Sequence, residues 1–169
     1  MSVCVQEADF DAGAEIAALG ATGGIGGIGG IGGAGVGAVA SFVGLVRADK
    51  VGSGDTPGTP SATAVQAMTL EHYPGMTEQA LEAIVAQAHG RWQLSGVRVI
   101  HRVGRLLPGD RIVFVGVASS HRHDAFAACE FIMDYLKTQA PFWKREETPQ
   151  GARWVDARDA DDAAAQRWR

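Results

Sequence analysis

The amino-acid sequence predicts an α+β fold in which largely antiparallel sheets pack against two main helices. Short segments with alternating or continuous apolar residues are typical of strands. Two longer segments have the apolar spacing of amphipathic helices. Turn sequences rich in Gly, Pro and Asp separate these segments. With 169 residues, the chain is long enough to bury the core of one domain.

The composition divides this single domain into three parts. Residues 1–19 form an N-terminal segment, within which residues 11–19 favour a helix. Residues 20–37 form a Gly-rich insertion that contains 11 of the 23 glycines. Residues 38–169 form the main domain, which carries the other predicted elements.

The main domain is predicted to follow the order β-β-α-β-β-α-β-β, with a loop at 48–63. Its expected strands are residues 38–47, 64–72, 97–103, 111–118, 142–147 and 152–157. Its expected helices are residues 77–90, 123–139 and, in the tail, 159–168. Thr77 should cap the first helix, and Ser119 or Ser120 the second. Gly90 and Pro141 should end them. We expect the helices to cover one side of the sheet.

The Gly-rich insertion formally contains G-x-G-x-x-G, the fingerprint of dinucleotide-binding proteins, at Gly24, Gly26 and Gly29. That motif binds pyrophosphate when a strand precedes it and a helix begins on it. Here a predicted helix precedes it, and the glycines continue as a GGI repeat. We therefore interpret the insertion as a low-complexity loop. A nucleotide-dependent oxidoreductase is kept as an alternative.

Charge and cysteine content exclude several classes of protein. The net charge is −4. The segment 1–46 contains four acidic residues and no Lys or Arg. Without a basic stripe, nucleic-acid binding is not expected. The two cysteines form no metal or disulfide pattern, and Cys129 should be a small core residue. With no secretory signal and no long apolar segment, we expect a cytoplasmic protein that does not bind membranes.

Lysine is rare in this chain, with three Lys against 12 Arg, and Lys137 and Lys144 bracket the aromatic turn 140–143. A Lys amine can lose its proton and act as a base or nucleophile, whereas Arg stays charged. Both lysines are therefore candidate catalytic residues, and ordinary surface charge is the alternative. Two-residue periodicity after the turn puts Lys144 and Glu146 on one face of a strand and Arg145 on the other.

His121 and Arg122 lie where the apolar strand 111–118 meets the second main helix. The free N–H groups of a helix start attract anions, and the Arg fork suits phosphate or carboxylate. An exposed polar turn is the alternative, and His123 should point elsewhere. Lys137 lies roughly two dozen ångströms further along this helix. Therefore either a ligand spans both ends, or a second copy of the chain completes the site.

Four segments resemble the catalytic, large subunit of molybdopterin synthase. They are SFVGLVR (41–47), LEHYPGMTEQALEAIVAQA (70–88), VIHRVGRLLPGDRIVFVGVASSHRHDAF (99–126) and FIMDYLKTQAPFWKRE (131–146). The resemblance extends over residues 38–168 and implies a hammerhead-like α/β fold for a catalytic domain. It also implies the family's activity in molybdenum cofactor biosynthesis, the transfer of sulfur to cyclic pyranopterin monophosphate to make the molybdopterin dithiolene.

The same motifs imply the residues of the active-site pocket. Lys137 and Lys144 are the implied catalytic residues. The implied substrate-binding residues are Phe42, Arg47, His121, Arg122, Arg145, Glu146 and Arg158. Lys137 is expected to be essential, as a proton donor or base or as an amine that reacts with the acyl tail, and Lys144 to stabilise negative charge. No resident cofactor or metal is implied, because the pterin is substrate and product.

The resemblance further implies two kinds of partner. The sulfur donor is a small ubiquitin-like subunit whose C-terminal Gly-Gly ends in a thiocarboxylate. Two large subunits form a homodimer, and a small subunit docks at each outer end to give a heterotetramer. A catalytically silent subunit that only docks the sulfur carrier is the alternative. The Gly-rich insertion departs from the family pattern, and we expect it to leave the chemistry intact.

Overall fold

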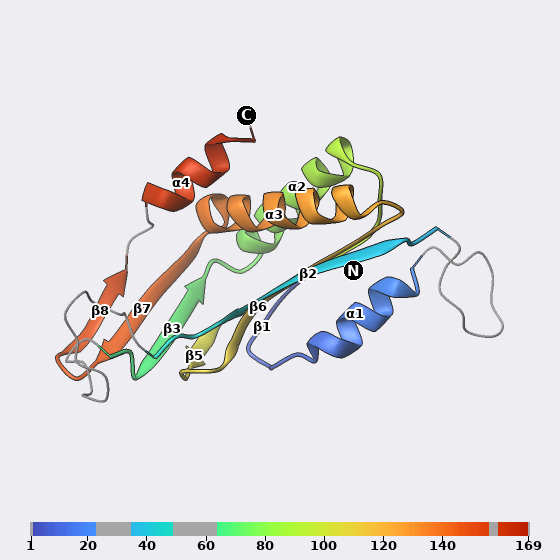
Figure 1. The fold of residues 1–169 in the computed structure, drawn as a ribbon. Helices are drawn as coiled ribbons and strands as arrows, with labels where there is room; N and C mark the ends of the chain where they lie inside the picture. The colour runs from blue at the N-terminus through green and yellow to red at the C-terminus, as the bar shows by residue number, and fades with distance from the viewer. Residues whose placement is uncertain (1, 23–34, 49–63, 156–158, 169) are drawn as a thin grey trace, which may run out of the picture.

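The computed structural model describes residues 2–22, 35–48, 64–155 and 159–168. These residues form two four-stranded sheets and their covering helices, as Figure 1 shows. Sheet A has the strand order β1-β4-β6-β2, and sheet B has the order β5-β3-β7-β8. The strand pairs are antiparallel apart from β1 with β4, which is parallel. The predicted α+β class with largely antiparallel sheets is therefore confirmed.

The predicted elements are present, with bounds that differ by a few residues. Sheet A consists of β1 (Val3–Gln6), β4 (Leu94–Arg102), β6 (Arg111–Ser119) and β2 (Ala38–Leu45). Sheet B consists of β5 (Gly104–Leu106), β3 (Ala67–His72), β7 (Phe142–Thr148) and β8 (Gly151–Val155). The helices are α1 (Ala12–Gly20), α2 (Met76–Arg91), α3 (Arg122–Gln139) and α4 (Asp159–Gln166). In the described ranges, no helix is long and apolar enough to cross a membrane.

Two short strands, β1 and β5, are absent from the predicted elements. β1 has four residues and pairs along β4, a partner that local sequence does not reveal. β5 has three residues and follows β4 almost at once. Gly104, the first residue of β5, has φ at +81°, a conformation that glycine adopts easily. This bend carries the chain from sheet A into sheet B.

The predicted N-caps of both main helices are wrong by one or two residues. Gly75 caps α2 in place of Thr77, and the Gly75 N–H donates to the Glu78 carboxylate at 2.7 Å. Thr77 is buried instead, and its hydroxyl donates to a backbone carbonyl at 3.0 Å. His121 caps α3, and its N–H donates to the Ser119 hydroxyl at 3.2 Å. The Thr77 and Ser119 hydroxyls thus form hydrogen bonds with nearby backbone groups although neither residue is the N-cap.

Helices cover both faces of sheet A, so the expectation that they cover one side is wrong for this sheet. On one face, α2 and α3 pack against Val115 and Val117 of β6 (Figure 1). On the other face, Leu19 of α1 packs against Phe114. The approach is close, because a Cβ added at Gly116 would lie 2.4 Å from Leu19 Cδ1. Burial from both sides explains the continuous apolar sequence of β6.

Acidic residues of the N-terminal segment pair with arginines of sheet A. The Arg98 Nε atom lies 3.0 Å from Glu15 Oε2. The Arg111 Nε atom donates to Asp9 Oδ1 at 3.0 Å, and Arg102 Nη1 lies 3.6 Å from the same oxygen. The acidic start of the chain therefore has a structural explanation, since two of its carboxylates pair with arginines of the sheet that it covers.

Candidate active site

Two cations approach the buried carboxylate of Glu146 on sheet B. The Lys144 Nζ atom lies 3.6 Å from Glu146 Oε1, and Arg153 Nη2 donates to Glu146 Oε2 at 3.2 Å. The Glu146 side chain is only 5% exposed, whereas those of Lys144 and Arg153 are 32% and 47% exposed. A buried carboxylate requires such compensation. The carboxylate is thus enclosed while the Lys144 amine can be reached from solvent.

The β7–β8 hairpin sets this arrangement. Glu146 and Arg153 are directly opposite each other in its register, so their side chains share one face of the sheet. Gly151 closes the turn with φ at +119°, and its carbonyl accepts a hydrogen bond from the Thr148 hydroxyl at 3.0 Å. The tight turn therefore determines which cation meets Glu146 from the neighbouring strand.

An apolar cluster lies beneath the charged group. In β3, Leu70 is opposite Lys144 and Met68 is opposite Glu146. The cluster consists of Val46, Met68, Leu70 and Leu106, with Ile112 against its side. Such surroundings strengthen electrostatic interactions, because few solvent dipoles screen them. Lys144 and Glu146 therefore form a partly desolvated ion pair.

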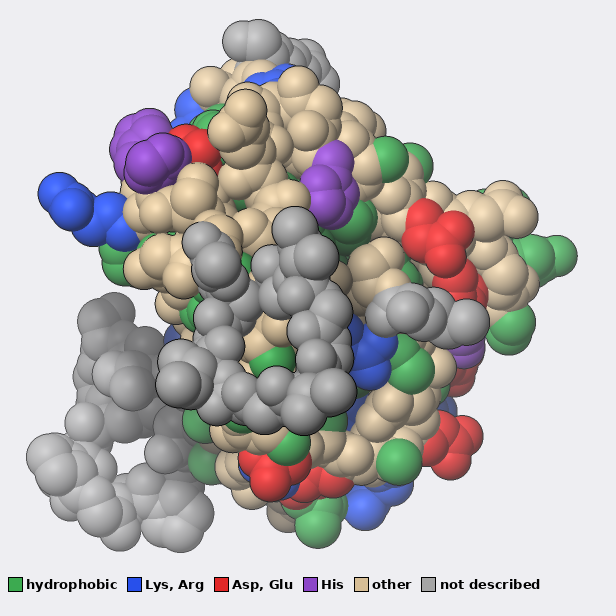
Figure 2. All heavy atoms as spheres, turned by 90° about the vertical axis from the view of Figure 1, so that its right-hand side faces the viewer, with side chains coloured by type: hydrophobic (Ala, Val, Ile, Leu, Met, Phe, Trp, Pro, Cys, Tyr) green, Lys and Arg blue, Asp and Glu red, His purple; other side chains and the backbone are tan. Residues whose placement is uncertain are grey.

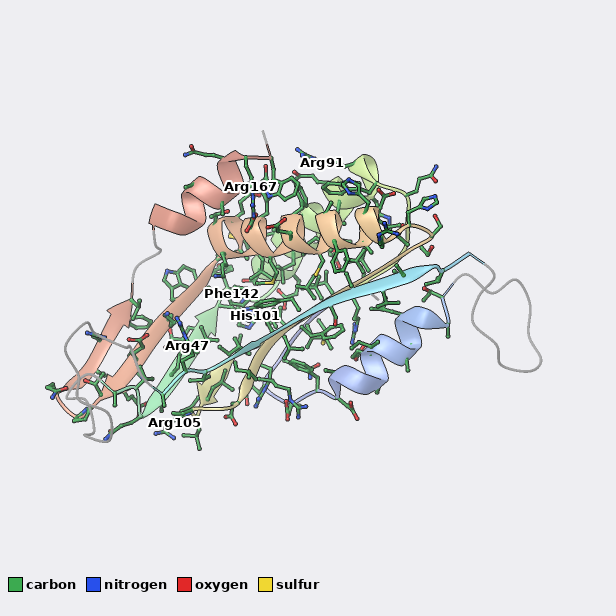
Figure 3. All side chains as sticks on the ribbon, viewed as in Figure 1. Arg47, Arg91, His101, Arg105, Phe142 and Arg167 are labelled. Atoms are coloured by element: carbon green, nitrogen blue, oxygen red, sulfur yellow. The ribbon has the colours of Figure 1, made fainter. Side chains whose placement is uncertain are left out.

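A stack of aromatic rings fixes the corner where α3 passes into β7. The Phe142 ring lies flat on the His101 ring, with centroids 3.7 Å apart and planes inclined by 17° (Figure 3). His72 stacks against Phe142 at 6.4 Å, and the Thr77 hydroxyl donates to the Pro141 carbonyl at 3.3 Å. Burial lowers the pKa of His101 from 6.5 to about 4, so this imidazole is neutral near pH 7. Contacts from β4, β3 and α2 thus fix the position of the corner.

Lys137 lies just before this corner, in the last turn of α3, and its side chain is exposed. The fixed corner therefore determines how Lys137 and Lys144 are placed relative to each other. As predicted, Lys144 and Glu146 share a face of β7, together with Phe142.

Phe42 and Arg47 belong to the edge strand β2 and the residues after it. Phe42 is 42% exposed and lies opposite Val115 of β6, on the face of sheet A that α3 covers. Val46 packs into the apolar cluster under the ion pair, which brings the end of β2 to sheet B. Arg47 follows as an exposed residue, and Figure 3 shows it near sheet B.

Arg145 lies on the opposite face of β7 from Lys144, as two-residue periodicity predicts. Its guanidinium carbon is 5.9 Å from the ring centroid of Trp154, which is opposite it in β8. Its Nε atom is buried and has no hydrogen-bond partner among the described residues. The structure therefore does not bring Arg145 to the Lys144–Glu146 pair.

His121 and Arg122 lie at the far end of α3 from Lys137 (Figure 1). They line a hollow of about 670 Å³ together with His123, Phe126, Ala127 and Glu130. His123 thus faces the same hollow as His121, and the expectation that it points elsewhere is wrong. Figure 2 shows this end of the molecule, where His side chains gather beside Lys or Arg side chains.

The described part of one chain contains two separate candidate regions, one at each end of α3. The helix rise between Arg122 and Lys137 is about 22 Å. The first region holds the lysine pair with Glu146, and the second holds His121 and Arg122. Arg158 and the fingerprint glycines of the insertion lie outside the described residues.

Cys129 is buried in the core, as expected from the sequence. Burial raises the pKa of its thiol to about 11. A thiol in this state is a poor nucleophile at neutral pH.

His101 and Arg153 are absent from the predicted site residues. The predicted turn at 148–151 already determines the hairpin register, so Arg153 could have been placed opposite Glu146 from the sequence. His101 offers no such signal, because its contact with Phe142 joins strands of different sheets.

Comparisons with known proteins agree with this architecture and with the resemblance seen in the sequence. The model of the MoaE protein family matches residues 5–139. A molybdopterin synthase catalytic subunit from Ralstonia nicotianae is 58% identical over 99% of this chain and 84% of its own length. Another from Pseudomonas aeruginosa is 51% identical over 99% of both chains.

Solved structures give the same assignment. A molybdopterin biosynthesis MoaE protein from Burkholderia ambifaria is 51% identical, with a TM-score of 0.73 over 99% of this chain and 97% of its own. Molybdopterin synthase from Staphylococcus aureus is 29% identical, with a TM-score of 0.62 over 72% of this chain and 81% of its own. From the family match over most of its length and the high identity of these relatives, the chain belongs to the MoaE protein family.

Proposed function

We propose that this protein is the catalytic subunit of a molybdopterin synthase. It transfers sulfur from the thiocarboxylated C-terminus of a small ubiquitin-like protein to cyclic pyranopterin monophosphate, and the product is the dithiolene of molybdopterin. The observation that carries the proposal is the solvent-accessible Lys144 beside buried Glu146, next to the fixed corner that leads to Lys137. The name of the curated relatives, a catalytic subunit, supports it.

The two lysines have different roles in the proposed reaction. Lys144 is held in a partly desolvated ion pair, where a fixed cation stabilises the negative charge that develops on sulfur and oxygen during transfer. Lys137 is more exposed and supplies the proton donor or base when the cyclic phosphate opens. Arg47 and Phe42, which are both exposed, provide a cation and an apolar wall for the planar pterin.

His121 and Arg122 bind the phosphate of the substrate in this proposal. Their place at the start of α3 suits an anion, because free N–H groups and a positive partial charge gather there. They are too far from Lys137 to complete its site within one chain. We therefore propose a homodimer in which one protomer supplies this anion site to the lysine pair of the other, with Arg158 as a further contact.

The sulfur carrier is the second partner. A thiocarboxylate is anionic, so the cations Lys137, Lys144 and Arg47 at one end of the molecule favour its entry. With one carrier on each protomer of the dimer, the assembly is a heterotetramer. The pterin is substrate and product, so the proposed reaction needs no resident cofactor or metal, and the enzyme works in the cytoplasm.

Reconstitution tests this function directly. The purified chain is mixed with thiocarboxylated small subunit and cyclic pyranopterin monophosphate, and molybdopterin is measured after conversion to a fluorescent derivative. We expect product in proportion to the thiocarboxylate consumed. If the chain binds the small subunit but forms no product, the alternative of a silent docking subunit is correct.

A further inference from the structure

We propose that Arg153 is a positioning residue for Lys144: it anchors one oxygen of the Glu146 carboxylate, and the anchored carboxylate fixes where the Lys144 ammonium lies. The effect of Arg153 on catalysis rests on the proposed function, in which Lys144 is a catalytic residue. Its structural basis is the group Arg153–Glu146–Lys144, which spans the strands β7 and β8.

The two cations meet different oxygens of the same carboxylate. Arg153 Nη2 lies 3.2 Å from Oε2, which is a hydrogen-bond length, whereas Lys144 Nζ lies 3.6 Å from Oε1, which is an ion-pair length. The carboxylate is therefore bound more firmly by Arg153 than it binds the Lys144 ammonium. A firm contact from Arg153 and a weaker one from Lys144 suit a catalytic cation, because the Lys144 ammonium is held in place and can still turn towards a substrate.

Burial makes Arg153 necessary for this balance. The Glu146 side chain is 5% exposed, so water cannot take over the role of a lost cation. Arg153 is 47% exposed, and its Nη2 atom lies 3.2 Å from the Glu146 carboxylate. Without Arg153, the carboxylate would lose one of the cations that compensate it and would attract Lys144 more strongly, so the Lys144 amine would be less available to the substrate.

The residue type and the strand register both fit this role. An Arg side chain stays charged at any physiological pH and presents a planar fork of donors to a carboxylate. Arg153 reaches Glu146 directly across the hairpin, a placement fixed by the turn at Thr148 and Gly151. A Lys at position 153 would restore the charge but not the fork.

Kinetics of Arg153→Gln and Arg153→Lys provide the first test. In the reconstituted reaction, we expect Arg153→Gln to lower kcat by about 10- to 100-fold, because a small displacement of a catalytic group has effects of this size. The KM for the pterin should change less than about twofold, since the proposed role of Arg153 is to position Lys144 and not to bind the substrate. Arg153→Lys should recover part of the lost kcat.

Arg105→Gln is the matched control. Arg105 also belongs to sheet B and also pairs with a glutamate, Glu147, at 2.9 Å, but this pair does not involve Lys144. Its loss should leave kcat and KM unchanged. Equal thermal unfolding temperatures of the variants would show that a lower kcat does not reflect a damaged fold.

Lysine labelling gives a readout that is independent of activity. The full chain is treated briefly with acetic anhydride, and acetylation of Lys144 and Lys137 is compared by peptide mass spectrometry. In Arg153→Gln, the ratio of Lys144 to Lys137 labelling should fall by about threefold or more, because the stronger pair protects the amine. In Arg105→Gln, the ratio should not change.

A double-mutant cycle shows whether Arg153 acts through Glu146. In a Glu146→Gln background, Arg153→Gln should have no further effect on the labelling ratio. Unchanged kcat and labelling in Arg153→Gln, or an equal labelling change with and without Glu146, would overturn the inference. If the unmutated chain made no product, the proposed function would fail, and the labelling ratio would still decide whether Arg153 controls Lys144.

Discussion

The imidazole of His101 lies 3.7 Å from the phenyl ring of Phe142, and this contact joins sheet A to sheet B at the corner between the two candidate catalytic lysines. The site is buried, and burial disfavours the charged imidazolium and lowers the pKa of His101 to about 4. The stability of the corner is therefore linked to pH.

Acidification should destabilise the protein through His101. The pKa is about 6.5 in the unfolded chain and about 4 in the folded chain, so between these values the unfolded state binds more protons. Stability is therefore lost as the pH falls from about 6.5 to 4, by about 3 kcal/mol from this one group. Urea unfolding at several pH values measures the loss.

The variant His101→Phe keeps a stacked ring but cannot be protonated, so its free energy of unfolding should depend less on pH over this range. His123→Phe is the control, because His123 is exposed and should show the same pH dependence as the unmutated protein. An unchanged pH dependence in His101→Phe would contradict the assignment.

Much of this architecture follows from the sequence, because it depends on local patterns. The apolar run of β6 and the spacing in α3 identify core elements without reference to other segments. The lysine pair and Glu146 follow from composition and from two-residue periodicity on β7. Family resemblance then gives these residues a chemical role.

The features missed from the sequence depend on contacts between distant segments. β1 is a strand because it pairs with β4, and α1 covers the second face of sheet A because Gly116 lets Leu19 approach. The stack of His101 on Phe142 depends on how the two sheets meet. Short elements and contacts between sheets carry little local signal, so propensity and periodicity do not find them.

The N-terminal segment should be required for full stability. Phe10 is 7% exposed and packs edge-on against Phe114, with ring centroids 6.0 Å apart. Phe10→Ala should lower the free energy of unfolding by about 3 kcal/mol or more, a cost typical of a lost core aromatic ring. Ile16→Ala, at a 38% exposed position of α1, is the control and should cost much less. Similar losses in both variants, measured by urea unfolding, would mean that the segment is not specifically docked.

The two cysteines should differ in their reactivity. Cys129 is buried with its thiol pKa raised to about 11, whereas Cys4 is partly exposed. Iodoacetamide at pH 8 should therefore alkylate Cys4 in the native protein and leave Cys129 unmodified, and mass spectrometry gives the extent at each site. In urea both should react. Rapid labelling of native Cys129 would show that the core around α3 opens easily.

Lys137→Ala should abolish molybdopterin formation. Loss of a group that transfers protons lowers the rate by about 100-fold or more, with the substrate still bound. Lys50→Ala is the control, because Lys50 is the third lysine of the chain and belongs to none of the motifs implied in catalysis. Single-turnover assays with saturating thiocarboxylated partner measure the chemical step. Wild-type turnover by Lys137→Ala would exclude Lys137 from the reaction.

A mixture of two inactive variants should recover activity if the site is shared between protomers. Arg122→Ala lacks the proposed anion site, and Lys137→Ala lacks the proposed proton donor, and these residues lie at opposite ends of α3. In a dimer that contains one of each, the intact Lys137 of one protomer meets the intact Arg122 of the other, whereas the second site has lost both. Random pairing of equal amounts should therefore restore about a quarter of wild-type activity. The variants are mixed, exchanged at low concentration and assayed with the sulfur carrier. If each site were contained within one chain, the mixture would be no more active than the average of its two components.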